Sequence, residues 1–132
     1  MLESSLLERV RTVLTALPEI ELAFVFGSAA KGRLRVDSDL DVAVQTREPL
    51  DAAAKFALIG DLALATGRAV DLIELGSAGT ALLGQILNHG QRVLGSEAEH
   101  ARLLTRYLID VADFMPCVER LQRERRRAWI GR

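Results

Sequence analysis

The most constraining feature of the sequence is a pair of short apolar runs that flank a polar segment. The first run, Ile20 to Phe26, is rich in β-branched and aromatic residues and ends at Gly27-Ser28. The second run, Leu40 to Gln45, begins directly after Asp37-Ser38-Asp39. Apolar runs of this length and composition are typical of buried strands. The chain is therefore expected to build its core around a β-sheet.

Helical and extended patterns alternate along the rest of the chain. Apolar residues at helical spacing predict a helix from about Ser5 to Leu17, and an alanine-rich segment predicts another from Pro49 to about Thr66. Three further elements follow: a strand from Ala69 to Leu75, a helix from Thr80 to Asn88 and an edge strand from Gln91 to Leu94. This alternation predicts an α/β (α+β) fold with a small mixed sheet, whose flanking helices pack mostly on one face.

A long amphipathic stretch, about residues 96–128, is expected to form a C-terminal helical segment. Tyr107 falls on its apolar stripe and is expected to be a core residue. Pro116 interrupts the stripe, which predicts a kink or two consecutive helices there. No repeat or linker-like composition divides the chain, so residues 1–132 are expected to form one domain. The apolar stripe consists of Leu103, Leu104, Tyr107, Leu108, Val111, Phe114, Val118 and Leu121.

Composition narrows the class of protein. The chain has 132 residues, of which 49% are hydrophobic, enough for one core without a disulfide or a structural metal. Its one cysteine, Cys117, allows neither an internal disulfide nor a Cys-x-x-Cys zinc pair. No apolar stretch approaches the ~18–20 residues that span a bilayer. The lone cysteine suits a reducing compartment, so the chain is expected to be cytoplasmic. Its net charge of −1 predicts that it does not bind nucleic acid directly.

Arginines are concentrated near the C-terminus, with five of them between Arg120 and Arg127. Such a cluster is usually a solvated helix end, where cations interact favourably with the helix dipole. The density of the cluster also suits contact with a partner protein or with RNA. The sequence leaves both interpretations open.

The Gly27-Ser28 dipeptide lies where the first strand is expected to run into a short helix beginning at Ala29. A helix N-terminus offers free backbone N–H groups and a positive dipole end, which suit phosphate. Glycine allows a tight turn and a close approach to a ligand, and the Ser28 hydroxyl adds a donor. Ser28 could also cap the helix, a role compatible with phosphate binding.

Three aspartates form the second part of the candidate site. Asp39 and Asp41 are two residues apart at the head of a strand, so both carboxylates are expected on one face, opposite Leu40. They repel each other unless a cation lies between them, and Mg²⁺ prefers carboxylate and phosphate oxygens. If the strand carrying Asp71 is the neighbouring strand, Asp71 completes a site for two metal ions. Asp39 and Asp41 would then hold the phosphates through the ions, and Asp71 would serve the acceptor hydroxyl.

The pattern of Gly27-Ser28, ten residues and then Asp39-x-Asp41 resembles that of the minimal nucleotidyltransferases (MNT proteins) of the polymerase-β-like superfamily. The strand Val70-Asp71-Leu72-Ile73 is similar to the family's third-carboxylate strand, and the segment from Gly90 through Pro116 is similar to its C-terminal region. Lys31 stands where arginine is common, so the positive charge is kept but a bidentate grip on phosphate is lost.

The resemblance implies an antitoxin that transfers AMP from ATP to a tyrosine of a HEPN-domain RNase toxin, in a hetero-oligomer with that toxin. It implies catalytic and metal-binding roles for Asp39, Asp41 and Asp71, with Mg²⁺ as cofactor. It also implies nucleotide-binding roles for Gly27, Ser28 and Lys31.

Other interpretations stay open at this stage. The chain could transfer a nucleotide to a small molecule such as an aminoglycoside, or it could neutralise a partner by contact alone, with a relic site. Asp37-Ser38-Asp39 could be a solvated turn, and Asp71 could be an edge residue. His89 and His100 lack partners at metal-ligand spacing and are expected to be exposed or to cap helices.

Overall fold

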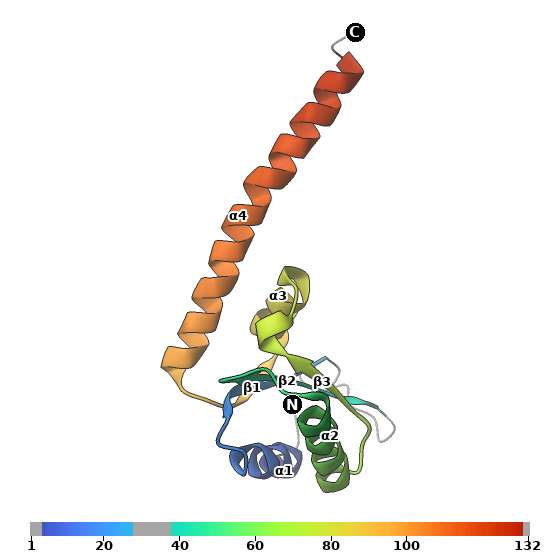
Figure 1. The fold of residues 1–132 in the computed structure, drawn as a ribbon, viewed down its shortest axis with the longest axis vertical. Helices are drawn as coiled ribbons and strands as arrows, with labels where there is room; N and C mark the ends of the chain where they lie inside the picture. Colours follow the sequence, from blue (N-terminus) through green and yellow to red (C-terminus); the bar gives the residue numbers. More distant parts are fainter. Residues whose placement is uncertain (1–3, 28–37, 131–132) are drawn as a thin grey trace.

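The computed structural model describes residues 4–27 and 38–130. Its sheet has four strands, in the order β3-β2-β1-β4 (Figure 1). β1 is antiparallel to both of its neighbours, whereas β2 and β3 are parallel, so the sheet is mixed as predicted. β4 is an edge strand, also as predicted. The strand bounds are β1 Ile20–Phe26, β2 Leu40–Thr46, β3 Val70–Glu74 and β4 Gln91–Leu94.

Helices cover both faces of the sheet (Figure 1). α1 (Ser4–Thr15) and α2 (Ala52–Thr66) lie on one face, and α3 (Thr80–His89) and α4 (Glu97–Ile130) lie on the other. A 3₁₀ turn, η1 (Leu75–Ser77), follows β3. The expectation that the helices pack mostly on one face is wrong. The reason lies in β1, whose residues from Leu22 to Phe26 are all buried, so that both of its faces need an apolar cover.

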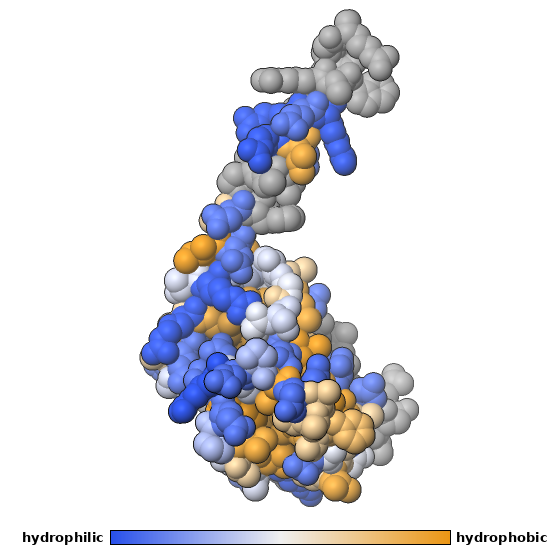
Figure 2. Space-filling view, viewed as in Figure 1, coloured by the Kyte–Doolittle hydropathy of each residue, from blue (hydrophilic) through white to orange (hydrophobic). Residues whose placement is uncertain are grey.

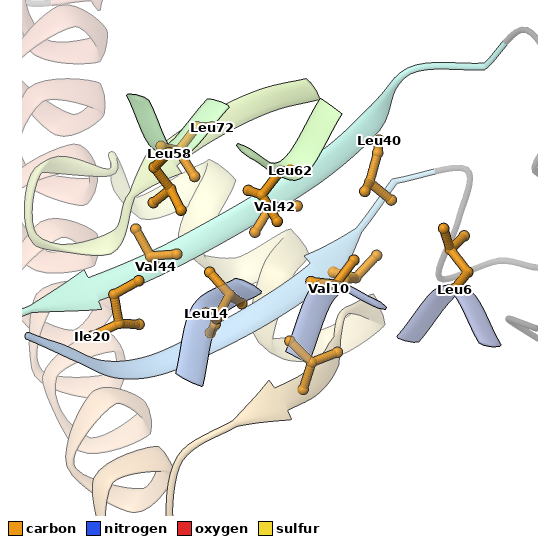
Figure 3. Packing of buried hydrophobic residues seen from close by; sticks show 13 residues of the cluster. Leu6, Val10, Leu14, Ile20, Leu40, Val42, Val44, Leu58, Leu62 and Leu72 are labelled. Carbon is orange, nitrogen blue, oxygen red and sulfur yellow. The ribbon is translucent and has the colours of Figure 1, made fainter. Parts of the chain in front are cut away.

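The core on the α1–α2 face supports the rest of the sheet. Val10 and Leu14 of α1 and Leu58 and Leu62 of α2 meet the alternate strand residues that include Val42 (Figure 3). α2 has a defined start, because the Asp51 carboxylate accepts a hydrogen bond from the Ala54 amide at 2.7 Å. Its end is also defined, because Gly67 takes a left-handed conformation with φ of 70°, as its position after the helix predicted. These caps fix the two ends of the helix that connects β2 to β3.

α4 is one uninterrupted helix of 34 residues, so the expected division into two helices at Pro116 is wrong. A proline removes one backbone hydrogen bond, and a helix this long retains many others. Beyond its first turns α4 projects away from the sheet (Figure 1). None of the described helices is both long and apolar enough to cross a bilayer, α4 included.

Only the start of the apolar stripe on α4 reaches the core. Leu103 is buried and Tyr107 is half-buried against the α3–α4 cluster, as expected for Tyr107. Leu104, Leu108 and Leu121 are exposed. The side chains of Phe114 and Val118 lie outside the described part of the structure.

Two leucines on α4 provide a matched test of this arrangement. Leu103 is 2% exposed and Leu121 is 53% exposed. We expect Leu103→Ala to lower the free energy of unfolding by about 2–4 kcal/mol, because it leaves a cavity in the core. Leu121→Ala should change it by less than about 0.5 kcal/mol. Urea unfolding followed by circular dichroism measures both, and equal losses would contradict the burial pattern.

Candidate active site

The pairing of β2 with β3 brings the carboxylates together. In the parallel register Asp41 lies beside Asp71, and Leu40 lies beside Val70. The Leu40 amide donates to the Ala69 carbonyl at 2.8 Å, which fixes the heads of the two strands. Asp39 immediately precedes β2. The predicted three-carboxylate site depended on β3 being the neighbour of β2, and the two strands are neighbours in the structure.

The carboxylates of Asp41 and Asp71 belong to the face of the sheet that α3 and α4 cover. Side chains alternate along a strand, and Leu40, Val42 and Val44 belong to the α1–α2 core. Ala43 and Ile73 belong to the opposite cluster, with which Asp41 and Asp71 are in phase. The expected split between carboxylate and apolar residues on β2 is therefore confirmed for Asp41, whereas Asp39 lies just before the strand. Asp71 lies on an edge strand and is exposed, whereas Asp41 lies inside the sheet and is half-buried.

Gly27 closes the site from the side of β1. Phe26, the last residue of β1, pairs with Asp41, and the chain then turns at Gly27 with a φ of 71°. A Cβ atom at Gly27 would overlap the Oδ2 atom of Asp41. The positive φ favours glycine here, and a side chain would in addition force the Asp41 carboxylate to move. The sequence indicated a tight turn at this residue, but it did not reveal that the glycine packs directly on the carboxylate.

Burial and neighbouring negative charges both act on the Asp41 carboxylate. The pKa of Asp41 is raised above its usual range, first by burial and then by the negative charges of Asp71 and Asp39. The ionised form of Asp41 is therefore disfavoured in the folded protein. A cation placed among the three carboxylates would reverse this effect.

The donor set suits a hard divalent cation, for which carboxylate oxygens are the preferred protein ligands. Within residues 4–27 and 38–130, no three Asp, Glu, His or Cys side chains converge into a ready-made metal cluster. Asp39, Asp41 and Asp71 are among these residues, so they do not by themselves form a complete metal-binding group. In phosphoryl-transfer sites, substrate phosphates and water complete the coordination of Mg²⁺.

Other residues singled out from the sequence have varied places. Ser28 and Lys31 lie outside the described residues. His89 is exposed in the last turn of α3, as expected. His100 is half-buried, so the expectation of an exposed or capping residue is wrong for it. The centroids of the His100 and Phe24 rings are 5.1 Å apart, and the rings meet edge to face. This contact arises because β1 places Phe24 beneath the start of α4.

Comparison with known proteins agrees with this geometry. Residues 8–99 match the family model described as polymerase beta, nucleotidyltransferase. The chain belongs to this family. It is 35% identical over 83 residues to protein adenylyltransferase MntA of Shewanella oneidensis. That match covers 63% of this chain and 60% of the relative, so the chain spans about three fifths of that protein's length.

Solved structures of family members share the fold. A toxin–antitoxin crystal structure with AMP-PNP superposes with a TM-score of 0.70 at 26% identity, covering 88% of this chain and 98% of the other. The MntA–HepT toxin–antitoxin superposes with a TM-score of 0.74 at 23% identity, covering 92% of this chain and 97% of the other. A complex of tri-AMPylated Shewanella oneidensis HEPN toxin with MNT antitoxin superposes with a TM-score of 0.65 at 24% identity. The match covers 89% of this chain and 96% of the other.

Two glycines allow a matched test of the close packing. We expect Gly27→Ala to destabilise the protein and to weaken binding of Mg·ATP, because its methyl group displaces the Asp41 carboxylate. Gly60→Ala in α2 meets no atom within 4 Å and should stabilise the protein by roughly 0.5–1 kcal/mol. Thermal unfolding with and without Mg·ATP measures both variants. A Gly27→Ala protein with unchanged stability and binding would contradict the contact.

The raised pKa of Asp41 gives a second expectation. Because folding disfavours the ionised form, the charge lowers stability at pH values above the folded-state pKa. In a chelating buffer at pH 7, Asp41→Asn should therefore unfold at a higher temperature than the wild type. The difference should shrink as the pH falls through that pKa and the wild-type carboxylate becomes neutral.

The same variant should respond differently to ligand. Mg·ATP should stabilise the wild type more than Mg²⁺ or ATP alone. The ion offsets the negative charge of the carboxylates, and the phosphates of ATP supply further oxygen ligands to the ion. Asp41→Asn should lose most of that gain. Equal stabilisation of the wild type by ATP in excess chelator would argue against a metal between the aspartates and the phosphates.

Proposed function

We propose that this protein is a metal-dependent nucleotidyltransferase that transfers AMP from ATP to a tyrosine hydroxyl of a partner HEPN RNase toxin, and so acts as its antitoxin. The observation that carries the proposal is the pairing of Asp41 with Asp71, with Gly27 packed on Asp41. Its support from known proteins is the 35% identity to a protein adenylyltransferase. The structural relatives include a toxin–antitoxin bound to AMP-PNP.

The reaction is a displacement at the α-phosphorus of ATP. The tyrosine oxygen forms a bond to that phosphorus, the bond from the phosphorus to the bridging oxygen breaks, and pyrophosphate leaves. The tyrosine proton passes to Asp71 or to water. Mg²⁺, in one or two ions held by the three aspartates, would neutralise charge on the attacking and leaving oxygens.

The position of each carboxylate suggests a division of labour. Asp41 is half-buried beside the end of β1, where Gly27 begins the turn proposed to hold the triphosphate. We assign Asp39 and Asp41 to the ions that contact the phosphates, and Gly27, Ser28 and Lys31 to the nucleotide. Asp71 is exposed on the edge strand, which leaves room for a large acceptor to approach. We therefore assign Asp71 to the acceptor hydroxyl.

A protein acceptor fits the chain better than a small molecule. Most of α4 projects away from the sheet (Figure 1), and Asp39 and Asp71 are exposed. A second macromolecule can supply the missing wall of the site. We place the reaction in the cytoplasm, where ATP and an RNase toxin would both be present.

The decisive test is the mass of the partner. Incubation of the protein with Mg·ATP and its HEPN partner should add the mass of one adenylyl group per transfer, as measured by intact-protein mass spectrometry. RNase activity should fall in parallel. Peptide mapping should place the added group on a tyrosine.

Variants separate this function from its competitors. The Asp39→Asn/Asp41→Asn double variant should bind the partner but leave its mass unchanged. Asp71→Asn should retain Mg·ATP binding but slow transfer by orders of magnitude. Silencing of the toxin by wild-type protein with no change in mass would favour inhibition by contact alone. Nucleotide transfer to an aminoglycoside, without transfer to the partner, would favour the small-molecule function.

A further inference from the structure

A concave surface lies at the end of the sheet away from the carboxylates. Its volume is about 510 Å³, and Glu21, Arg47, Gly76, Arg102, Leu103 and Arg106 help to line it. These residues come from the start of β1, the end of β2, the 3₁₀ turn after β3 and the first turns of α4. Figure 2 shows hydrophilic side chains gathered where the base of α4 meets the sheet. We call this surface the basic pocket.

Positive charge exceeds negative charge at the basic pocket. Arg47 forms an ion pair with Glu21 at 3.5 Å, and Arg106 forms one with Asp110 at 3.8 Å. Arg102 joins neither of the two ion pairs found among the described residues, so the three arginines leave an excess of one positive charge. The Arg47 side chain is 74% exposed and can reach a ligand from solvent. Leu103 and Gly76 contribute an uncharged lining.

We propose that the basic pocket binds an acidic segment of the protein that accepts AMP. This inference rests on the proposed function, because it assumes a protein acceptor. Guanidinium groups bind carboxylates in a planar, two-point geometry, and three of them around one concavity suit a segment with several acidic residues. Charge complementarity of this kind chiefly speeds association and selects the partner.

One feature of the pocket favours an acidic peptide over RNA. The residues that line the pocket include no aromatic side chain on which a base could stack. A peptide can instead place single carboxylates near the arginines and aliphatic groups near Leu103.

The location of the pocket fits a role in orienting the acceptor. Thr46, which lines the pocket, follows Asp41 by five positions along β2, a span of about 17 Å in an extended strand. The pocket also adjoins α4, on the face of the sheet that carries the aspartates. An acceptor anchored there can present a tyrosine to Asp71 from a fixed direction. The arginines touch neither ATP nor the reacting atoms, so they are positioning residues.

A charge reversal tests the proposal. Arg102→Glu/Arg106→Glu should raise the KM for the HEPN partner by about tenfold at low salt, with kcat unchanged, since only docking is affected. Addition of salt should narrow the difference from the wild type. The matched control is Arg9→Glu/Lys55→Glu, which makes the same charge change on α1 and α2, on the other face of the sheet. The control should retain the wild-type KM. Unchanged Mg·ATP binding and melting temperature would show that both variants are folded.

Binding without ATP separates this inference from the proposed function. The Kd for the partner should rise in the pocket variant but not in the control, whether or not AMP is transferred. A short polyglutamate peptide should compete with the partner for the wild type and not for the pocket variant. Equal Kd and KM values for the two variants would overturn the docking site. Stronger competition by single-stranded RNA of equal charge would identify a nucleic-acid site instead. Absence of AMP transfer by the wild type would overturn the proposed function alone.

Discussion

The parallel pairing of β2 with β3 is the interaction on which the candidate site depends. It places Asp41 directly beside Asp71, and no other strand of the described sheet is parallel to its neighbour. A parallel pair needs a crossover, which α2 provides between the two strands. The caps at Asp51 and Gly67 fix the two ends of that crossover. Residues far from the carboxylates thus decide whether the carboxylates meet.

Much of the fold could be predicted because local patterns agreed with the final structure. The apolar runs at 20–26 and 40–45 became β1 and β2 almost residue for residue, and Gly67 ended α2 as its position suggested. The alternation on β2 was also visible in the sequence, since Leu40 and Val42 interleave with the aspartates. The proximity of Asp41 to Asp71 could be stated only conditionally. Strand order arises from long-range pairing, which periodicity does not encode.

The errors share one physical origin, namely that an apolar pattern does not identify the surface that covers it. β1 is apolar on both faces, and this required helices on both sides of the sheet rather than on one. On α4 the stripe continues past Leu103 to Leu121, yet only its first part contacts the core. His100 shows the same limit, because its burial depends on Phe24, some 76 positions earlier in the chain.

The two faces of the sheet contribute differently to the stability of the fold. The α1–α2 face is a continuous apolar core, and each large side chain buried there contributes roughly 1.5–3 kcal/mol. The other face holds a smaller cluster and Asp41, whose ionised form is disfavoured in the folded protein first by burial and then by the charges of Asp71 and Asp39. The apolar face offsets that cost, so Asp41 can keep its place beside Asp71 before a cation arrives. Gly27 serves the same arrangement, because a side chain there would force the Asp41 carboxylate out of its position.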